Sequence, residues 1–176
     1  MKRFACCLAG AALASVISSA AFPLDLIRES KAVSVIVVPD AATPLEQEGA
    51  ATLVKYLKMS SSVELPVVKE SQKPSGTLVS VGKTRMAEKT GVTDRGLKHD
   101  GYRLAVKEGV LYILGRDTKI LKPPPGGGDR IGAQGSRRAA LGLLYRLGFR
   151  WLQPTPRGVH APLLTTVSVP DDLDVT

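Results

Sequence analysis

The stretch from Gly101 to Gly115, GYRLAVKEGVLYILG, decides the fold of this chain. Apolar and polar residues alternate on both sides of Glu108-Gly109, which is the pattern of two antiparallel strands joined by a two-residue turn. The turn sets the register of the strands and gives the hairpin one strongly apolar face. That face consists of Tyr102 and the opposed pairs Leu104 with Ile113 and Val106 with Leu111. The stretch therefore predicts a β-hairpin with one face in the core.

The opposite face of the hairpin is half apolar. Val110, Tyr112 and Leu114 lie there across from Arg103, Ala105 and Lys107. Such a face is too apolar for plain solvent and too polar for a full core, which is typical of a docking surface. We expect Val110, Tyr112 and Leu114 to meet a partner domain or, without one, a second copy of the chain.

Other strands and helices flank the hairpin on both sides. In chain order we expect a buried strand at Val33–Val38, a helix from Thr43 to about Met59-Ser60, an edge strand at Val63–Val68, a strand at Leu78–Val81, a helix at Ser136–Leu147, a short strand at Arg150–Leu152 and a last strand at Thr165–Val169. This order predicts an α/β (α+β) two-layer fold, a mixed sheet with two helices mainly on one face.

Both helices carry start signals. Thr43 caps the first helix, Pro44 fits its first position and Glu46 completes a capping box, while Ser136 caps the second. Gly148 is the expected left-handed stop of the second helix. The apolar stripes are Ala50, Leu53, Val54 and Leu57 in the first helix and Ala140, Leu141, Leu144 and Leu147 in the second.

The stretch SGTLVSVGKTR, which begins at Ser75, imitates the end of a phosphate-binding loop. Such a loop needs glycine five positions before Gly82, where this chain has Thr77. The residues between them are β-branched and favour a strand. We therefore expect a strand that leaves the sheet at Gly82, and no ATP site.

The N-terminus has the parts of a secretory signal peptide: Lys2-Arg3, an apolar run and small residues up to Ala21. We expect residues 1–21 to be this signal and residues 22–32 to be a linker. Export to the periplasm or the extracellular space follows, and both cysteines leave with the signal. No other segment is long and apolar enough to cross a membrane.

The formal net charge is +8, but the basic residues are scattered through loops and helix ends. A nucleic-acid surface would gather them beside aromatic residues, so we expect no nucleic-acid partner. The chain has two histidines, and we expect no metal site and no cofactor.

Four stretches appear in a suggestive order: VIVVPDAATPLEQEGAATLVKYL, LVSVGKT, DGYRLAVKEGVLYILGRD and GSRRAALGLLYRLGFRWLQP. This succession resembles the non-catalytic N-terminal α/β domain of α-glucuronidases, of family 20 β-N-acetylhexosaminidases and of related exported proteins. The resemblance covers residues 33–170. It implies an accessory domain in carbohydrate metabolism, in which Gly82-Lys83-Thr84 closes a strand.

In the resembled enzymes a catalytic barrel follows this domain, and here residues 171–176 form a tail where the barrel would begin. Glycoside hydrolysis needs two carboxylates across the scissile bond. Asp100 and Asp117 flank the open end of the hairpin and are the best candidates for such a pair, but acids in turns usually serve the turn. We expect no catalytic residues, and no enzyme activity from this chain on its own.

Trp151 and Arg150 are the candidate sugar-binding residues, because an indole face stacks on sugars and a guanidinium binds carboxylates. The plainer interpretation packs Trp151 behind the second helix. We therefore expect an exported, non-catalytic accessory domain of the glycoside-hydrolase type, whose partner is a catalytic barrel. The alternatives are a stand-alone carbohydrate- or uronate-binding module and a small hydrolase that uses Asp100 or Asp117.

Overall fold

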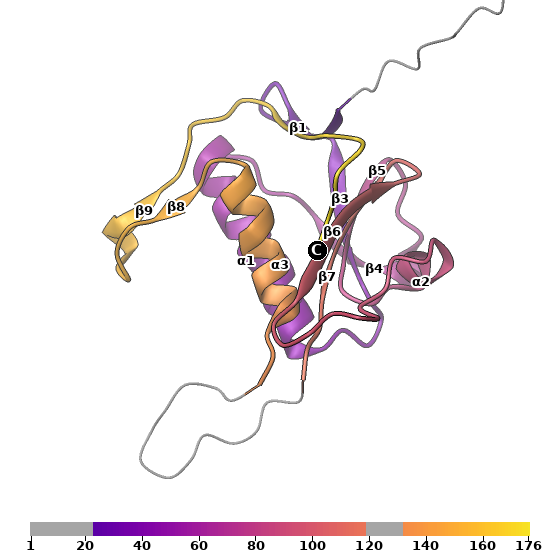
Figure 1. Ribbon diagram of the computed structural model, residues 1–176. Helices are drawn as coiled ribbons and strands as arrows, with labels where there is room; N and C mark the ends of the chain where they lie inside the picture. The colour runs from indigo at the N-terminus through magenta and orange to yellow at the C-terminus, as the bar shows by residue number, and fades with distance from the viewer. Residues whose placement is uncertain (1–22, 119–131) are drawn as a thin grey trace, which may run out of the picture.

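The computed structural model describes residues 23–118 and 132–176. The predicted signal peptide and residues 121–131 of the Pro/Gly-rich loop lie outside these ranges. The described residues form a six-stranded mixed sheet, two smaller sheets and three α-helices (Figure 1). The predicted α/β architecture is confirmed.

The six-stranded sheet has the order β11-β6-β7-β5-β3-β4. Its strands are β3 (Ser34–Val38), β4 (Val67–Lys69), β5 (Thr77–Val81), β6 (Tyr102–Lys107), β7 (Val110–Gly115) and β11 (Asp174–Val175). Neighbours among β4, β3, β5 and β7 are parallel, whereas β6 runs antiparallel to β7 and β11 antiparallel to β6. The short β4 lies at an edge, as its Pro-interrupted sequence predicts.

The β6–β7 hairpin has the predicted register. Leu104 is opposite Ile113 and Val106 is opposite Leu111. Glu108 and Gly109 both have positive φ, 53° and 73°, which matches the twist of the strands they join. The prediction of this hairpin from the local sequence is therefore confirmed.

Two long helices, α1 (Pro44–Ser61) and α3 (Gly135–Arg146), pack together on one face of the sheet (Figure 1). The capping box of Thr43 and Glu46 is present, and Gly148 has a φ of 99° just after α3. The apolar stripe of α3 is rotated about the helix axis relative to the predicted stripe. Its buried apolar residues are Ala139, Ala140, Leu143 and Leu144, while Leu141 and Leu147 are only partly buried.

A third helix corrects the predicted docking face. The short α2 (Arg85–Lys89) follows β5. Its residue Ala87 and Val92 of the loop after α2 pack on the far face of the sheet. Tyr112 and Leu114 are each 1% exposed beneath them. The expectation that these hairpin residues stay open for a barrel or a second copy is therefore wrong, because the chain covers them itself.

The predicted linker and tail are also part of the folded body. β1 (Leu24–Arg28) pairs with β2 (Lys31–Ala32) and with β10 (Val167–Val169) in a three-stranded sheet. Leu26 and Ile27 of β1 are buried in the main core. At the other end, β11 pairs with β6. Residues 23–32, the described part of the predicted linker, and residues 171–176 are thus not plain connectors, because each segment carries a strand.

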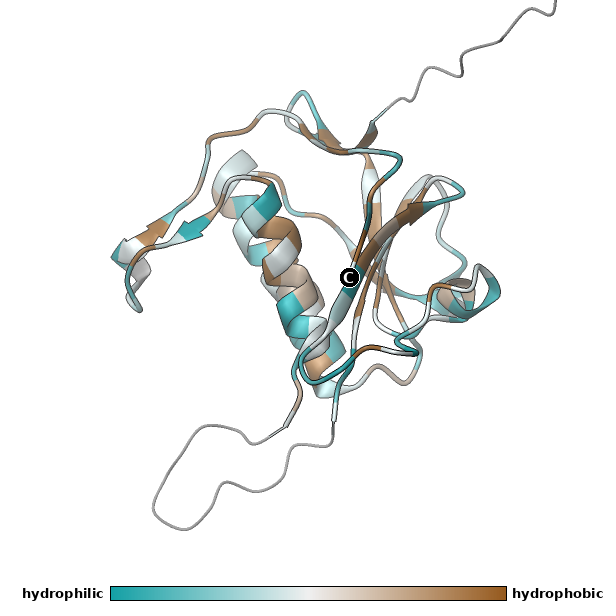
Figure 2. Cartoon of the chain, viewed as in Figure 1, coloured by the Kyte–Doolittle hydropathy of each residue, from teal (hydrophilic) through white to brown (hydrophobic). Residues whose placement is uncertain are grey.

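Two short strands between α3 and β10, β8 (Arg150–Trp151) and β9 (Val159–His160), form a small antiparallel arm that stands beside α1 and α3 (Figure 1). Two 3-10 turns complete the description, η1 (Glu70–Gln72) and η2 (Pro156–Gly158). Apolar residues follow the central strands and the inner sides of the long helices (Figure 2). The main core therefore lies between the sheet and the α1–α3 pair, and the arm lies at its outer margin.

Candidate functional site

A groove of about 630 Å³ lies between α1 and the β8–β9 arm. It is called the Trp151 groove below. Its lining consists of Lys55, Tyr56 and Met59 from α1, Arg137 from α3, residues 151–155 and Val159. Met59 and Leu152 are 46% and 76% exposed, so the groove presents apolar surface to solvent. Apolar walls with a few polar groups are typical of ligand sites.

Trp151 is held in one orientation. Its indole Nε1 donates a hydrogen bond of 3.1 Å to the hydroxyl of Tyr56, and the two rings meet edge to face at 5.3 Å between centroids. Phe149 lies behind the indole at 6.4 Å with an interplanar angle of 22°. Trp151 stays partly exposed in the groove wall. The aromatic wall is therefore formed by the chain's own contacts before any ligand arrives, which lowers the entropic cost of binding.

The second predicted sugar-binding residue lies elsewhere. The Nη1 of Arg150 donates hydrogen bonds of 2.7 Å to the carbonyl oxygens of Tyr145 and Phe149. Its guanidinium lies 3.8 Å from the centroid of the Tyr145 ring. Neighbouring residues of a strand point to opposite sides. Trp151 therefore lines the groove, whereas Arg150 secures the end of α3 outside it.

Two cations that sequence reasoning missed line the groove instead. The Nζ of Lys55 lies 5.3 Å from the centroid of the Tyr56 ring. Arg137 contacts Glu48 at 3.3 Å and donates from Nη1 to Gln134 at 3.1 Å. No acidic residue is among those that line the groove. The sequence places Lys55 on an exposed face of α1 beside Tyr56, but no local pattern indicates that this face meets Trp151, which lies about a hundred positions later in the chain.

The candidate catalytic acids Asp100 and Asp117 meet at the start of α3. Asp117 Oδ1 accepts a hydrogen bond of 2.9 Å from the backbone N–H of Ser136, and Asp100 Oδ1 accepts one of 2.8 Å from that of Gln134. Burial raises the pKa of Asp117 above its ordinary value, opposed by its hydrogen bonds with Ser136. The residues thus act as helix caps.

The predicted role of Ser136 is wrong for the same reason. The helix begins one residue earlier, at Gly135, and Gln134 stands at the N-cap without a side-chain hydrogen bond. The buried Ser136 offers its own N–H to Asp117. The carboxylate of Asp117, just after β7, supplies what a local serine cap would have given.

Carboxylates occupy the starts of the other helices too. Glu46 accepts the N–H of Thr43 at 2.7 Å before α1, and also the N–H of Lys83 at 2.8 Å. Glu70 accepts the N–H of Arg85 at 2.8 Å, at the first residue of α2. β5 ends at Val81, and the Nζ of Lys83 pairs with Asp94 at 2.6 Å. The backbone groups that a phosphate-binding loop would aim at an anion are therefore directed at the protein's own acids.

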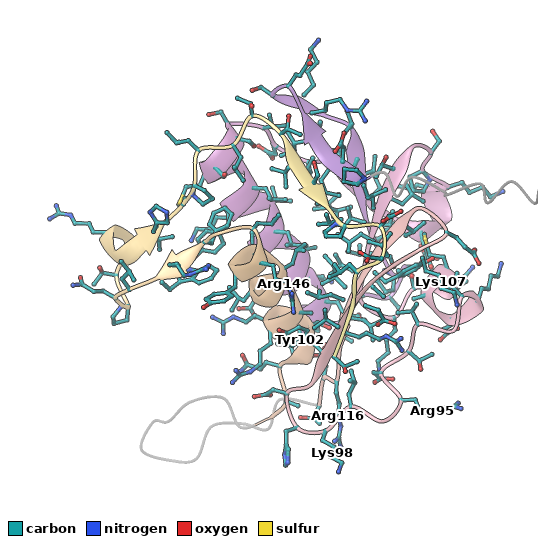
Figure 3. The ribbon with its side chains drawn as sticks, turned by 45° about the horizontal axis from the view of Figure 1, so that its top comes forward. Arg95, Lys98, Tyr102, Lys107, Arg116 and Arg146 are labelled. Carbon is teal, nitrogen blue, oxygen red and sulfur yellow. The ribbon has the colours of Figure 1, made fainter. Side chains whose placement is uncertain are left out.

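Other classes of site leave no signature in residues 23–118 and 132–176. No three His, Cys, Asp or Glu side chains gather there as metal ligands, and no helix in those ranges is long and apolar enough to span a bilayer. Lys98 and Arg116 project from one end of the molecule, while Lys107 and Arg146 lie apart from them (Figure 3).

No protein-family model matches the chain, and no curated protein matches it.

Proposed function

We propose that this protein is an exported, non-catalytic accessory domain of the glycoside-hydrolase type, which holds carbohydrate in the Trp151 groove. One observation carries the proposal: the Trp151 indole is fixed by Tyr56 and Phe149 while part of it faces a groove. Aromatic faces offer sugars a flat apolar surface, and the indole presents it at little entropic cost.

The use of the carboxylates supports a non-catalytic role. Retaining and inverting glycosidases place two carboxyl groups about 5 to 10 Å apart across a substrate cleft. Asp100 and Asp117 instead accept backbone N–H groups at the start of α3. Asp100 also pairs with Arg138 at 2.9 Å. Neither residue lines the Trp151 groove.

The order of sequence motifs supports the accessory role. A helix with a capping box, a strand closed by Gly82, a hairpin and a second helix that leads to Trp151 follow one another in this chain, and this order is the basis of the resemblance to the N-terminal accessory domains. We expect a catalytic partner domain to supply hydrolysis, and the signal-like residues 1–21 to direct export. The buried hairpin face excludes Tyr112 and Leu114 from contact with that partner.

Carbohydrate binding is tested with the chain's own fluorophore, because Trp151 is its one tryptophan. We expect soluble oligosaccharides to change the emission of Trp151 in a saturable way. Trp151→Ala removes the stacking surface, so we expect it to abolish oligosaccharide binding. Because this variant also lacks the fluorophore, its binding is measured by calorimetry. Tyr145→Ala is the matched control, since Tyr145 is an aromatic residue, 56% exposed, that lies outside the groove lining.

A folded Trp151→Ala protein that binds oligosaccharides as well as the wild type would overturn the proposed site. The hydrolase alternative has its own test with aryl glycosides and glucuronoxylan fragments. Turnover that disappears in both Asp100→Asn and Asp117→Asn would replace the non-catalytic proposal with a small hydrolase.

A further inference from the structure

The charges in the Trp151 groove select among carbohydrates. Resting on the proposed function, we infer that the groove prefers sugars that carry an anionic group, and that Lys55 is the residue that reads this group. The neutral part of the sugar meets the aromatic wall, and the anionic substituent meets the ammonium. Arg150, the cation that the sequence suggests for this role, lies outside the groove.

The first argument is the sign of the lining. Lys55 and Arg137 are the charged residues that line the groove, and both are positive. A groove lined by one sign of charge attracts ligands of the opposite sign and raises their local concentration. A neutral sugar gains nothing from this arrangement, whereas a uronate or a sulfated sugar does.

The second argument separates the two cations. Arg137 already has an acidic partner, because its Nε lies 3.3 Å from Glu48 Oε1. Lys55 has no ion pair with any residue in the part of the chain that the structure describes. Its ammonium lies 5.3 Å from the Tyr56 ring centroid, within reach of a cation–π contact. Lys55 therefore supplies the uncompensated charge in the groove.

The third argument is position. Lys55 and Tyr56 are consecutive residues of α1, and the Tyr56 hydroxyl accepts the hydrogen bond from the Trp151 indole. The Lys55 ammonium lies over the Tyr56 ring and the Trp151 indole lies beside it, so both groups border the same groove. A ligand stacked on Trp151 lies next to the cation without any rearrangement of the walls.

The test compares three oligosaccharides of equal length: a neutral galacto-oligosaccharide, the corresponding oligogalacturonate and a sulfated galacto-oligosaccharide. Affinities are measured by calorimetry and by Trp151 emission at low and at physiological salt. We expect at least one acidic oligosaccharide to bind about three- to fivefold more tightly than the neutral one, as for one partly exposed ion pair. The tighter of the two acidic ligands identifies the anionic group, and the preference should shrink with added salt.

Lys55→Gln should remove the preference for acidic over neutral oligosaccharides. Lys58→Gln is the matched control, since it removes the same charge from the same helix, where Lys58 pairs with Glu64 and does not line the groove. Equal binding of the three ligands by the wild type, or a preference that survives in Lys55→Gln, would overturn this inference and leave carbohydrate binding intact. Failure of all three ligands to bind would instead overturn the proposed function.

Discussion

Replacing Glu46 tests whether one buried carboxylate joins the start of α1 to the loop after β5. Glu46 is 4% exposed, and its two oxygens accept the backbone N–H groups of Thr43 and Lys83 at 2.7 and 2.8 Å. Glu46→Ala leaves both donors without a protein acceptor. Each costs about 1 kcal/mol at sites this close to solvent, and the lost charge near the helix start adds about 0.5 kcal/mol. We expect the free energy of unfolding to fall by about 2 to 3 kcal/mol.

Glu46→Gln should lower the free energy of unfolding by less than Glu46→Ala does. The amide keeps one acceptor oxygen and presents an NH₂ group to the second donor, so a loss of about 1 to 2 kcal/mol is expected. The measurement is urea unfolding, followed by helical circular dichroism and by Trp151 emission. Gln47→Ala is the control, because Gln47 also bonds to the backbone but is exposed, and should cost less than about 0.5 kcal/mol. A loss below about 0.5 kcal/mol in Glu46→Ala would refute the linking role.

Three further predictions concern stability. Gly82→Ala should lower the free energy of unfolding by more than about 1 kcal/mol in the same urea assay, because φ is 87° there and an added Cβ would collide with the side chain of Glu46. Asp25 has a pKa below its ordinary 3.8, chiefly through its hydrogen bond from Ser168, so its contribution is present above that value and is lost as the pH falls through the depressed pKa. The stability gap between wild type and Asp25→Asn at neutral pH should therefore narrow below about pH 4, and a gap that stays constant to pH 2 would contradict this. Tyr112→Lys should unfold the domain, since Tyr112 is 1% exposed, and a variant that stays folded by circular dichroism would contradict the burial of Tyr112.

Features set by neighbouring residues were predictable from the sequence. The hairpin register follows from alternation around Glu108-Gly109, and the start of α1 follows from Thr43, Pro44 and Glu46 within one turn of helix. In each case the residues that interact are close in the chain. Local geometry therefore fixes them before any tertiary contact is considered.

Features set by distant or very short segments were missed. The five residues of α2 are too few to show helical periodicity, so the cover over Tyr112 was not foreseen. β1 finds its partner strand β10 near the other end of the chain. The candidate site was incompletely predicted for the same reason: Tyr56 and Trp151, which form its wall, are 95 positions apart in the chain.

The acids at the helix starts also bear on what the carboxyl edge of this sheet can accept. In open α/β sheets that edge is where ligands commonly bind, and phosphates favour helix N-termini there. In this protein Glu46, Glu70, Asp100 and Asp117 already hold the N–H groups around α1, α2 and α3. Each acid is a tethered competitor, present at an effective concentration on the order of millimolar or more. A soluble anion that approaches one of these N–H groups must therefore outcompete a carboxylate of the chain itself.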